Sequence, residues 1–434
     1  AGVFCEAVLV SEAVEDAMSL GRALRETGEP PGRVARFIRR MHDADVLHRD
    51  LHGGNILVAG GELVLIDLHR VSVGAPLSRR RRVASVAQFL APLGDCIGRE
   101  ARLTFVREYL GPDAEQAEVD RFASSVEKAA ARWLERRYAS RTRRCIKRST
   151  GFRRERLPGL KVYRRAEFPV ELVARAIKQH RAGTAGGKGE GVLKCDDRTR
   201  VSVVDVVDVG EKDHPGRFCV KEFIRGGLLQ RINDVFRGSR ARLAWLGSNA
   251  CEVRGIRTPK AYAMAEAGPR SFLITDFVDG AVSFNWYASD FGRPRGREAT
   301  RKWRAFVRDA ADFVRLLHSH ALRHRDLAGK NILVREKDGG WEFYLVDVGD
   351  IRTGRTPSLG YKIKNLGQLD HVYVRPSRTD RLRFCRHYSR GRPEFDRREF
   401  LLEIDAISGA RQERWLECGG REILEERKQQ GKPA

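Results

Sequence analysis

Three polar side chains follow one another at a spacing that suits phosphoryl transfer. Asp326 is followed five residues later by Asn331, and Asp347 ends the next apolar segment, residues 342–346. Transfer of a phosphoryl group needs a carboxylate that orients the attacking hydroxyl and accepts its proton, and it needs metal ions that neutralise charge on the phosphates. We therefore expect Asp326 to act as the catalytic base, and Asn331 and Asp347 to hold the metal.

The same arrangement occurs twice along the chain. Residues 48–55 (the first motif) and 324–331 (the second motif) both begin His-Arg-Asp-Leu, end in Asn and run into Ile-Leu-Val. The equivalents in the first motif are Asp50, Asn55 and Asp67. A single such motif is often an ordinary loop beside a hairpin, but two with the same inner spacing favour a catalytic loop in tandem copies.

The region before the second motif contains the parts expected of an ATP site. An apolar strand carries Lys221 at its centre, and in kinases such a lysine grips the α- and β-phosphates. The apolar strand 273–277 leads into a connector like a kinase hinge, so we expect Asp276 and Phe277 to receive the adenine ring. The turn between the first two strands is expected to cover the phosphates with backbone N–H groups and Arg198.

Two features of this region are less regular. The glycines between residues 183 and 191 precede the first strand and are interpreted as a flexible linker. The helix expected after Ser239, a plausible N-cap, has Glu252 as its only carboxylate. Active kinases place a glutamate on this helix to pair with the phosphate-binding lysine. Glu252 is either that partner or a solvated helix residue, and we slightly favour the second interpretation.

The second motif with Asn331, together with residues 254–261 after the helix and 273–277 at the hinge, resembles the bacterial lipopolysaccharide kinase family. The likeness covers roughly residues 192–388, and the first copy from its hinge onward. Members phosphorylate Kdo or heptose sugars of the lipopolysaccharide inner core. The resemblance implies an α+β, protein-kinase-like fold with a small β-rich N-lobe and a helical C-lobe, ATP with Mg²⁺, and work at the cytoplasmic face of the inner membrane. Asp-Val-Gly and Asp-Leu-His replace the Asp-Phe-Gly of protein kinases.

The chain of 434 residues is long enough for two to three domains. We expect a truncated kinase-like C-lobe at 1–150, a basic, Gly-rich linker with a short helix at 151–190, a complete kinase-like domain at 191–420, and a charged tail at 421–434. Too few residues precede the first hinge strand for an N-lobe, which indicates a fragment of a longer reading frame or a genuine half-kinase.

Lys and Arg exceed Asp and Glu by 24, and the pI is near 10.1. Such a surplus favours a polyanionic partner, which could be nucleic acid, an anionic membrane surface or a phosphorylated glycolipid. The densest basic clusters are residues 79–82, 141–144 and 153–154. They contain no nucleic-acid-binding motif, and no apolar run approaches the roughly 18 residues of a membrane span. Eight scattered Cys indicate a reducing cytosol without structural zinc. We therefore expect a peripheral cytoplasmic protein.

The segment after Asp347 bears on the acceptor. Peptide-phosphorylating kinases close this segment with Ala-Pro-Glu. Here the segment lacks that sequence and is basic. A phosphorylated sugar suits it better than a peptide, with Arg355 and Lys362 as candidate contacts. The alternatives are a protein or small-molecule kinase of the same fold, such as an aminoglycoside-type enzyme, and a non-catalytic scaffold. The retained Asp326 and Asn331 argue against the scaffold.

Overall fold

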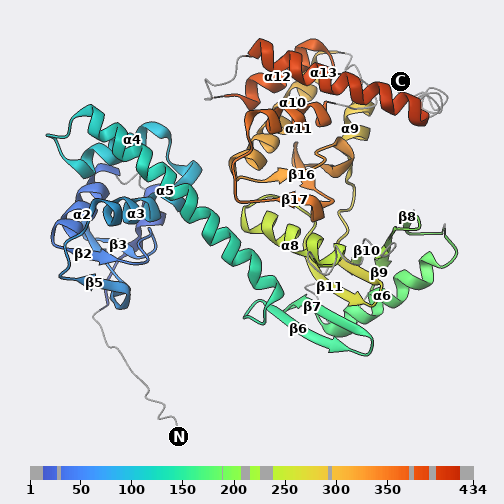
Figure 1. The fold of residues 1–434 in the computed structure, drawn as a ribbon, viewed down its shortest axis with the longest axis horizontal. Coiled ribbons are helices and arrows are strands. Elements are labelled where there is room, and N and C mark those ends of the chain that lie inside the picture. The colour runs from blue at the N-terminus through green and yellow to red at the C-terminus, as the bar shows by residue number, and fades with distance from the viewer. Residues whose placement is uncertain are drawn as a thin grey trace, which may run out of the picture. The chain divides into compact units, whose positions relative to one another are not determined.

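The computed structural model describes residues 13–26, 31–187, 189–206, 216–224, 238–291, 296–370, 376–390 and 397–420 (Figure 1). The chain divides into two compact units, residues 1–137 and 138–434. Each unit contains one of the two motifs.

The first unit is mainly helical, with two small sheets that hold the first motif. The strands β1, β3 and β4 form one sheet, and β2 pairs with β5 in the other. A two-residue turn with positive φ at Gly60 and Gly61 joins β3 to β4, which is the geometry that favours glycine in a tight hairpin. The elements are β1 (Met18–Ser19), α1 (Leu20–Glu26), α2 (Pro31–Asp43), β2 (Val46–His48), β3 (Ile56–Ala59), β4 (Glu62–Leu65), η1 (Leu68–Arg70), β5 (Val71–Val73), α3 (Arg79–Leu90), η2 (Ala91–Cys96), α4 (Arg99–Leu110) and α5 (Gln116–Thr142), the last of which continues into the second unit.

The second unit begins with an antiparallel seven-stranded sheet in the order β6-β7-β11-β12-β10-β9-β8. Regular β-branched and aromatic residues build its centre, where β10 lies between β9 and β12. The helix α8 begins after Ser239, whose hydroxyl accepts a hydrogen bond from the Arg242 N–H as the sequence predicted. The elements are η3 (Arg143–Ile146), β6 (Phe152–Leu157), β7 (Leu160–Arg165), α6 (Val170–Thr184), β8 (Val192–Cys195), β9 (Thr199–Asp205), β10 (Arg217–Ile224), α8 (Arg240–Val253), β11 (Ala261–Ala267) and β12 (Arg270–Asp276).

Residues 151–190 differ from the expected linker. They form β6, β7 and α6, and β7 pairs with β11 in register from Arg164 opposite Ala263 to Lys161 opposite Glu266. Basic residues in the two strands hid this pattern, because they alternate with apolar residues such as Val162, which is fully buried. The Gly-rich segment is then the short connection from α6 to β8, and Gly191 accepts a backbone hydrogen bond from the Val203 N–H at 2.8 Å.

The rest of the second unit is helical, apart from short strands that carry the second motif. A two-residue turn at Asp338 and Gly339, both with positive φ, joins β15 to β16. The elements are β13 (Val282–Ser283), α9 (Phe284–Phe291), α10 (Arg297–Ser319), β14 (Arg323–His324), η4 (Gly329–Asn331), β15 (Ile332–Lys337), β16 (Gly340–Leu345), η5 (Val348–Asp350), β17 (Ile351–Arg352), α11 (Leu359–Leu369), α12 (Arg378–Tyr388), α13 (Arg397–Trp415) and η6 (Leu416–Gly420).

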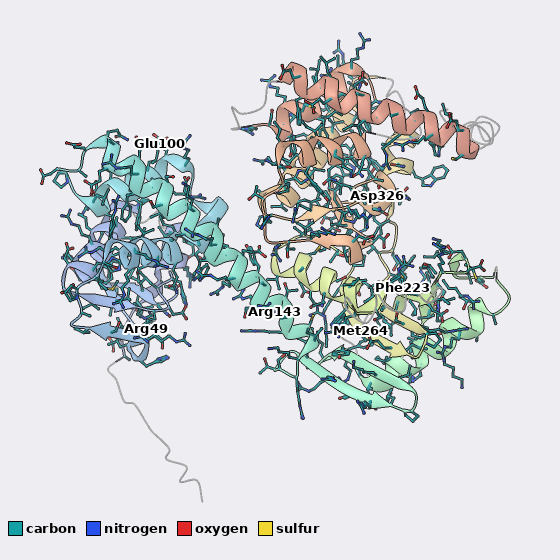
Figure 2. All side chains as sticks on the ribbon, in the orientation of Figure 1. Arg49, Glu100, Arg143, Phe223, Met264 and Asp326 are labelled. Carbon is teal, nitrogen blue, oxygen red and sulfur yellow. The ribbon has the colours of Figure 1, made fainter. Side chains whose placement is uncertain are left out.

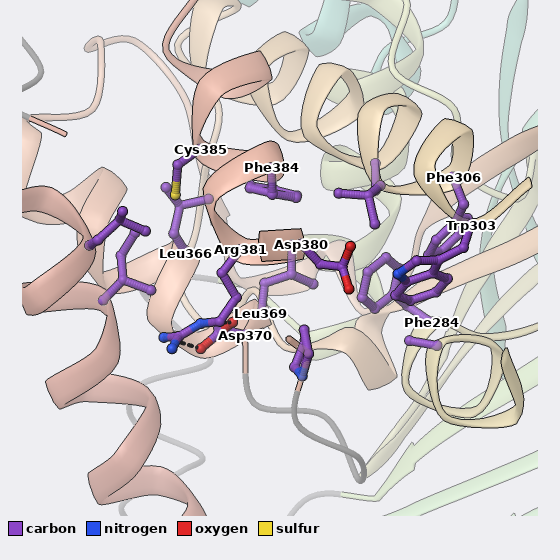
Figure 3. A pocket seen from close by; sticks show the side chains of 16 residues that line it. Phe284, Trp303, Phe306, Leu366, Leu369, Asp370, Asp380, Arg381, Phe384 and Cys385 are labelled. Carbon is purple, nitrogen blue, oxygen red and sulfur yellow. Dashed lines mark hydrogen bonds and ion pairs between the residues drawn. The ribbon is translucent and has the colours of Figure 1, made fainter. Parts of the chain in front are cut away.

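A mainly apolar pocket lies among the helices α9 to α13 (Figure 3). Phe284, Trp303 and Phe306 line it from one side, and the ion pair between Asp370 and Arg381 borders it at 2.8 Å. None of the side chains predicted to do chemistry lines this pocket. In the parts of the chain that the structure describes, no helix is long and apolar enough to cross a membrane.

The helix α8 packs directly on the backbone of η5, the turn that follows Asp347 (Figure 1). A Cβ atom added to Gly247 of α8 would lie 2.0 Å from the carbonyl oxygen of Val348 and 2.8 Å from its carbonyl carbon. The neighbouring atoms belong to the backbone, so they cannot give way by a simple change of side-chain rotamer. The position of α8 is therefore fixed against the segment that carries Asp347.

Replacing Gly247 with Ala tests this contact. A helical Gly→Ala change ordinarily stabilises by about 0.5–1 kcal/mol. Here we expect destabilisation by about 1–3 kcal/mol, because the added methyl group overpacks the contact with Val348. Hydrogen exchange of the α8 amides measures the local unfolding free energy. The matched control is Gly183→Ala in α6, where an added Cβ meets nothing within 4 Å. If the α8 amides were equally protected from exchange in the two variants, the close contact between Gly247 and Val348 would be contradicted.

Candidate active site

The second motif places Asp326 and Asn331 in a loop between β14 and β15. The Asn331 side-chain amide donates a hydrogen bond to the Asp326 carbonyl at 2.9 Å, and the Asp326 N–H donates to Nδ1 of His324 at 3.3 Å. His324 is buried, and burial lowers the pKa of its imidazole. These bonds fold the loop back on itself, so that the spacing of five residues brings the two predicted side chains together.

The helix α11 holds the same loop from outside. The Tyr361 hydroxyl and the Asn365 amide both donate to the His324 carbonyl, at 2.9 and 3.0 Å. The Gln368 side chain accepts a hydrogen bond from the Leu327 N–H at 3.0 Å and donates one to the Arg325 carbonyl at 3.2 Å. Asn365 and Gln368 are buried. Because a buried irregular backbone must find hydrogen-bond partners, these side chains determine the conformation of the loop.

Lys221 and Asp347 meet although 126 residues separate them in the sequence. The Lys221 ammonium lies 2.9 Å from Oδ1 of Asp347. This ion pair joins β10 of the sheet to the turn after β16. Figure 2 labels Phe223 on β10, two residues from Lys221, and Asp326 in the helical part. Asp347 adopts a left-handed backbone conformation with φ of 56°, which is rare for a residue other than glycine and occurs often at functional sites.

The charge of Lys221 sets the ionisation of Asp347. Partial burial raises the pKa of this carboxyl group, but the opposite charge and hydrogen bond of Lys221 outweigh it, with help from His324 and Arg240. The net result is a pKa below the usual value for aspartate. The low pKa means that this carboxylate is ionised at neutral pH. Its side chain keeps 55% of its surface exposed, so it is within reach of solvent.

Glu252 lies away from this ion pair. It forms an ion pair with Arg165, a residue of β7 that also donates to the Ala261 carbonyl at 2.7 Å. Glu252 therefore ties α8 to the sheet, so it is neither the partner of Lys221 nor merely a solvated helix residue. Lys221 pairs with Asp347 instead.

The turn predicted to cover the phosphates, residues 196–199, has hydrogen bonds of its own. The N–H groups of Arg198 and Thr199 both donate to Oδ1 of Asp196, at 2.9 and 2.7 Å. These two backbone N–H groups are thus engaged by Asp196, and the contact of this turn with the phosphates stays a prediction. The Arg198 side chain is exposed at the tip of the turn.

Of the two predicted hinge residues, Asp276 ends β12 and Phe277 follows it. The Asp276 N–H donates to the Lys260 carbonyl at 2.9 Å, which leaves Asp276 paired to the residue before β11. Burial raises the pKa of the Asp276 carboxyl group, against the opposing effects of the Tyr262 hydroxyl and Lys260. Phe277 is partly buried, and the Arg217 guanidinium lies 5.3 Å from its ring centroid.

Cations surround Asp326. Arg411 of α13 lies 3.3 Å from Oδ1 of Asp326, and Lys330 lies 3.7 Å from Oδ2. The predicted acceptor contacts, Arg355 and Lys362, lie on the segment before α11 and in its first turn, where Arg355 is exposed and Lys362 is partly buried. Sequence reasoning missed Arg411, because α13 lies far beyond the motif and no pattern connects the two.

The first motif repeats these contacts with different cations. Asn55 donates to the Asp50 carbonyl at 2.9 Å, and Asp67 has the same left-handed backbone as Asp347. Here the neighbours come from η1 itself, since the Arg70 guanidinium lies 3.5 Å from Asp50 and the His69 ring lies 2.7 Å from Asp67. Gln88 of α3 donates to the carbonyl of Arg49 and to the Asp50 carboxylate, at 3.1 and 3.3 Å.

A buried histidine also recurs behind both motifs. His42 contacts the Tyr109 hydroxyl and the Ser85 hydroxyl at 2.7 and 3.0 Å. His318 contacts the Tyr388 hydroxyl at 2.7 Å and the Asn365 side-chain oxygen at 3.2 Å. Burial lowers the pKa of His42 to about 4, so it is neutral near pH 7. Aligning the two segments in sequence would have drawn attention to Gln88 and Gln368, which occupy corresponding positions on α3 and α11.

The sheet with its central lysine, the helix α8 and the motif-bearing helical part define a protein-kinase-like fold. A sequence model of the Lipopolysaccharide kinase (Kdo/WaaP) family matches residues 1–92 and 240–388, together more than half of the chain. The chain belongs to this family.

Individual relatives are distant. A "3-deoxy-D-manno-octulosonic acid kinase" of Pasteurella multocida (strain Pm70) is 24% identical over 168 residues, which cover 36% of this chain and 65% of that protein. The solved structure of "WaaP in complex with acyl carrier protein" is 21% identical with a TM-score of 0.36, covering 56% of this chain and 95% of that one. The PknI kinase domain of Mycobacterium tuberculosis is 15% identical with a TM-score of 0.28, covering 52% and 99%.

The ion pair predicts a pH-dependent change when Lys221 is replaced with Met. With Lys221 present, the low pKa of Asp347 adds stability above the pKa of the unfolded chain, and this stability is lost as pH falls through the folded pKa. Removing the cation leaves burial to act on the carboxylate, so the titration midpoint of Asp347 should move upward. Carbon-13 NMR of labelled aspartate carboxyl groups measures the midpoint. Lys194→Met, which removes the partner of Asp196, is the matched control and should leave Asp347 unchanged.

Proposed function

We propose that this protein transfers the γ-phosphoryl group of ATP, with Mg²⁺, to a hydroxyl group of a sugar in lipopolysaccharide core or a related glycan. The observation that carries the proposal is the meeting of Lys221 with Asp347 beside the loop of Asp326 and Asn331. A phosphate-binding lysine, a metal carboxylate and a base held on one rigid frame are the parts that phosphoryl transfer requires. Membership of the lipopolysaccharide kinase family supports the sugar acceptor.

Each side chain has a role in this proposal. Lys221 binds the α- and β-phosphates, and the hinge at Asp276 and Phe277 receives the adenine. Asp326 orients the acceptor hydroxyl and takes its proton. Positioning by the hydrogen-bonded loop supplies much of the rate, because a base contributes only when it lies within hydrogen-bond reach of the proton that it accepts.

Asn331 and Asp347 fit a bound Mg²⁺. The Asn331 nitrogen is engaged with the Asp326 carbonyl, which leaves Oδ1 as the oxygen for a cation, and the Asp347 carboxylate is ionised and half exposed. Within the described ranges no group of three or more His, Cys, Asp or Glu side chains could hold a metal ion. Mg²⁺ commonly takes one or two protein ligands and completes its shell with substrate phosphates and water. Bound there, it would neutralise charge on the phosphates.

The basic surroundings of Asp326 favour an anionic acceptor. We propose that Arg355 and Lys362 contact the acceptor, a phosphorylated or carboxylated sugar on a glycolipid. We also propose that the two motifs are tandem copies and that the second carries the activity. In support of this, Asp347 pairs with Lys221 of the sheet, whereas the neighbour of Asp67 is His69 of its own turn.

We propose that the protein works at the inner face of the cytoplasmic membrane and is held there peripherally; the proposed acceptor and the positive charge support this. Arg79, Arg80 and Arg81 are exposed at the start of α3, whereas Arg82 is engaged with Asp43 at 2.5 Å. Exposed arginines near an anionic surface each contribute about 1 kcal/mol. The three free side chains, rather than the whole cluster, are thus the candidates for docking.

Substitutions at the three acidic positions test the activity. With radiolabelled ATP, Mg²⁺ and a Kdo-terminated lipid A acceptor, Asp326→Asn should lower the transfer rate on the order of 10²- to 10⁴-fold, since the base is lost. Asp347→Ala should reduce Mg²⁺-dependent transfer to background. Asp50→Asn is the matched control in the first motif and should leave the rate nearly unchanged. Transfer at the parent rate by Asp347→Ala would falsify the assignment, and equal losses from Asp50→Asn and Asp326→Asn would show that the first motif is also active.

Membrane docking is tested by sedimentation with vesicles. Binding to phosphatidylglycerol vesicles should fall steeply as salt rises, because exposed charges are screened beyond about 10 Å at 0.1 M ionic strength. Binding to phosphatidylcholine vesicles should be weak. Changing Arg79, Arg80 and Arg81 to Gln should lower partitioning on the order of 100-fold at low salt, given about 1 kcal/mol for each arginine. Binding that persists in 1 M salt would contradict electrostatic docking and indicate an apolar anchor.

A further inference from the structure

Arg411 reaches the predicted base from an element that the motif does not include. Its Nη2 atom lies 3.3 Å from Oδ1 of Asp326, and its side chain keeps 27% of its surface exposed. A guanidinium group has five N–H donors. Among the described residues, the Asp326 carboxylate is the only group that accepts a hydrogen bond from the Arg411 side chain. The Arg411 Nε atom is buried and has no hydrogen-bond partner there. The guanidinium therefore lies at the reacting carboxylate with donor capacity to spare.

The position of Arg411 is built into the packing of α13. A Cβ added to Gly367 of α11 would lie 2.6 Å from Ile407, one helical turn before Arg411, so the two helices are in close contact. Arg381 links them further, with ion pairs of 2.8 Å to Asp370 and to Asp405. The same α11 holds the catalytic loop through Gln368. One helix thus positions both Arg411 and Asp326.

In both motifs an arginine lies beside the aspartate carboxylate, but it comes from a different element in each. In the first, Arg70 of η1 approaches the Asp50 carboxylate at 3.5 Å. The corresponding residue three positions after Asp347 is Asp350, an acid, and Arg411 supplies the cation from α13 instead. A cation at this carboxylate is therefore present in both sites although its origin differs, which argues that it has a use beyond packing.

We propose that Arg411 binds an anionic group of the acceptor, a carboxylate or a phosphate, beside the hydroxyl that is phosphorylated. This rests on the proposed sugar-kinase function and adds a specificity-determining residue to it. An acceptor hydroxyl hydrogen-bonded to Asp326 lies next to the guanidinium, whose planar fork matches a carboxylate or a phosphate. A neutral sugar leaves the guanidinium with the base as its sole anionic partner. The site therefore selects an acid over its neutral analogue.

Equilibrium binding to the full chain tests the proposal without requiring turnover. The probes are Kdo against its methyl ester, and mannose 6-phosphate against mannose, measured by calorimetry. The wild-type protein should prefer the anion in at least one pair by about 10-fold or more, the range for a hydrogen bond to a charged group. The pair that shows the preference identifies carboxylate or phosphate as the source. Arg411→Gln should remove the preference, and Arg411→Lys should keep part of it.

The control is Arg414→Gln on the same helix, an exposed residue whose Nε donates to the Ala410 carbonyl at 3.2 Å. It should bind both pairs as the wild-type protein does. The proposal is overturned if the wild-type protein discriminates neither pair, or if Arg411→Gln still discriminates.

Turnover separates acceptor binding from positioning. With Kdo-terminated acceptor, Arg411→Gln should raise the acceptor KM about 10-fold or more and leave the KM for ATP unchanged. An equal fall of kcat with the acid and with its methyl ester would assign Arg411 to orienting Asp326 and overturn the proposal. Discrimination in binding without phosphoryl transfer to any acceptor would instead refute the proposed function alone.

Discussion

A buried stretch of irregular backbone must have its N–H and C=O groups satisfied by hydrogen-bond partners, and the loop of the second motif is such a stretch. Asn365 and Gln368 meet this requirement, and both are buried side chains of α11. Their dual role as donor and acceptor leaves little freedom in where α11 can lie. The docking of α13 on α11, and with it the position of Arg411, follows from this single demand.

The contact of α8 with η5 replaces the ion pair by which kinases usually orient this helix. Glu252 is used elsewhere, on Arg165, and Gly247 allows backbone-to-backbone contact with Val348. Steric contact between main chains is short-ranged and insensitive to salt, unlike a half-exposed pair of charges. In this protein the placement of the helix is thus decided by shape, and the lysine is left to interact with Asp347.

The sequence predicted those parts whose signal is local. The spacing of Asp326, Asn331 and Asp347, the strand with Lys221 and the N-cap at Ser239 depend on neighbours within a few residues, and the structure places them as expected. It could not predict Arg411 or Gly247, because their contacts join elements separated by dozens of residues. The strands β6 and β7 were missed for a different reason. Basic residues on their exposed positions imitate a linker in composition, and only pairing with β11 distinguishes them.

The ion pair of Lys221 and Asp347 has a consequence for energetics under the proposed function. The two charges compensate each other in the ion pair, so neither has to be stabilised as a lone ion. Under the proposed function, phosphate would pair with Lys221, and Asp347 would hold the magnesium ion. Binding is then an exchange of partners in which each protein charge has a counterion at the start and at the end. Such an exchange avoids the desolvation penalty of creating an unpaired charge, and it lets selectivity come from geometry rather than from net attraction.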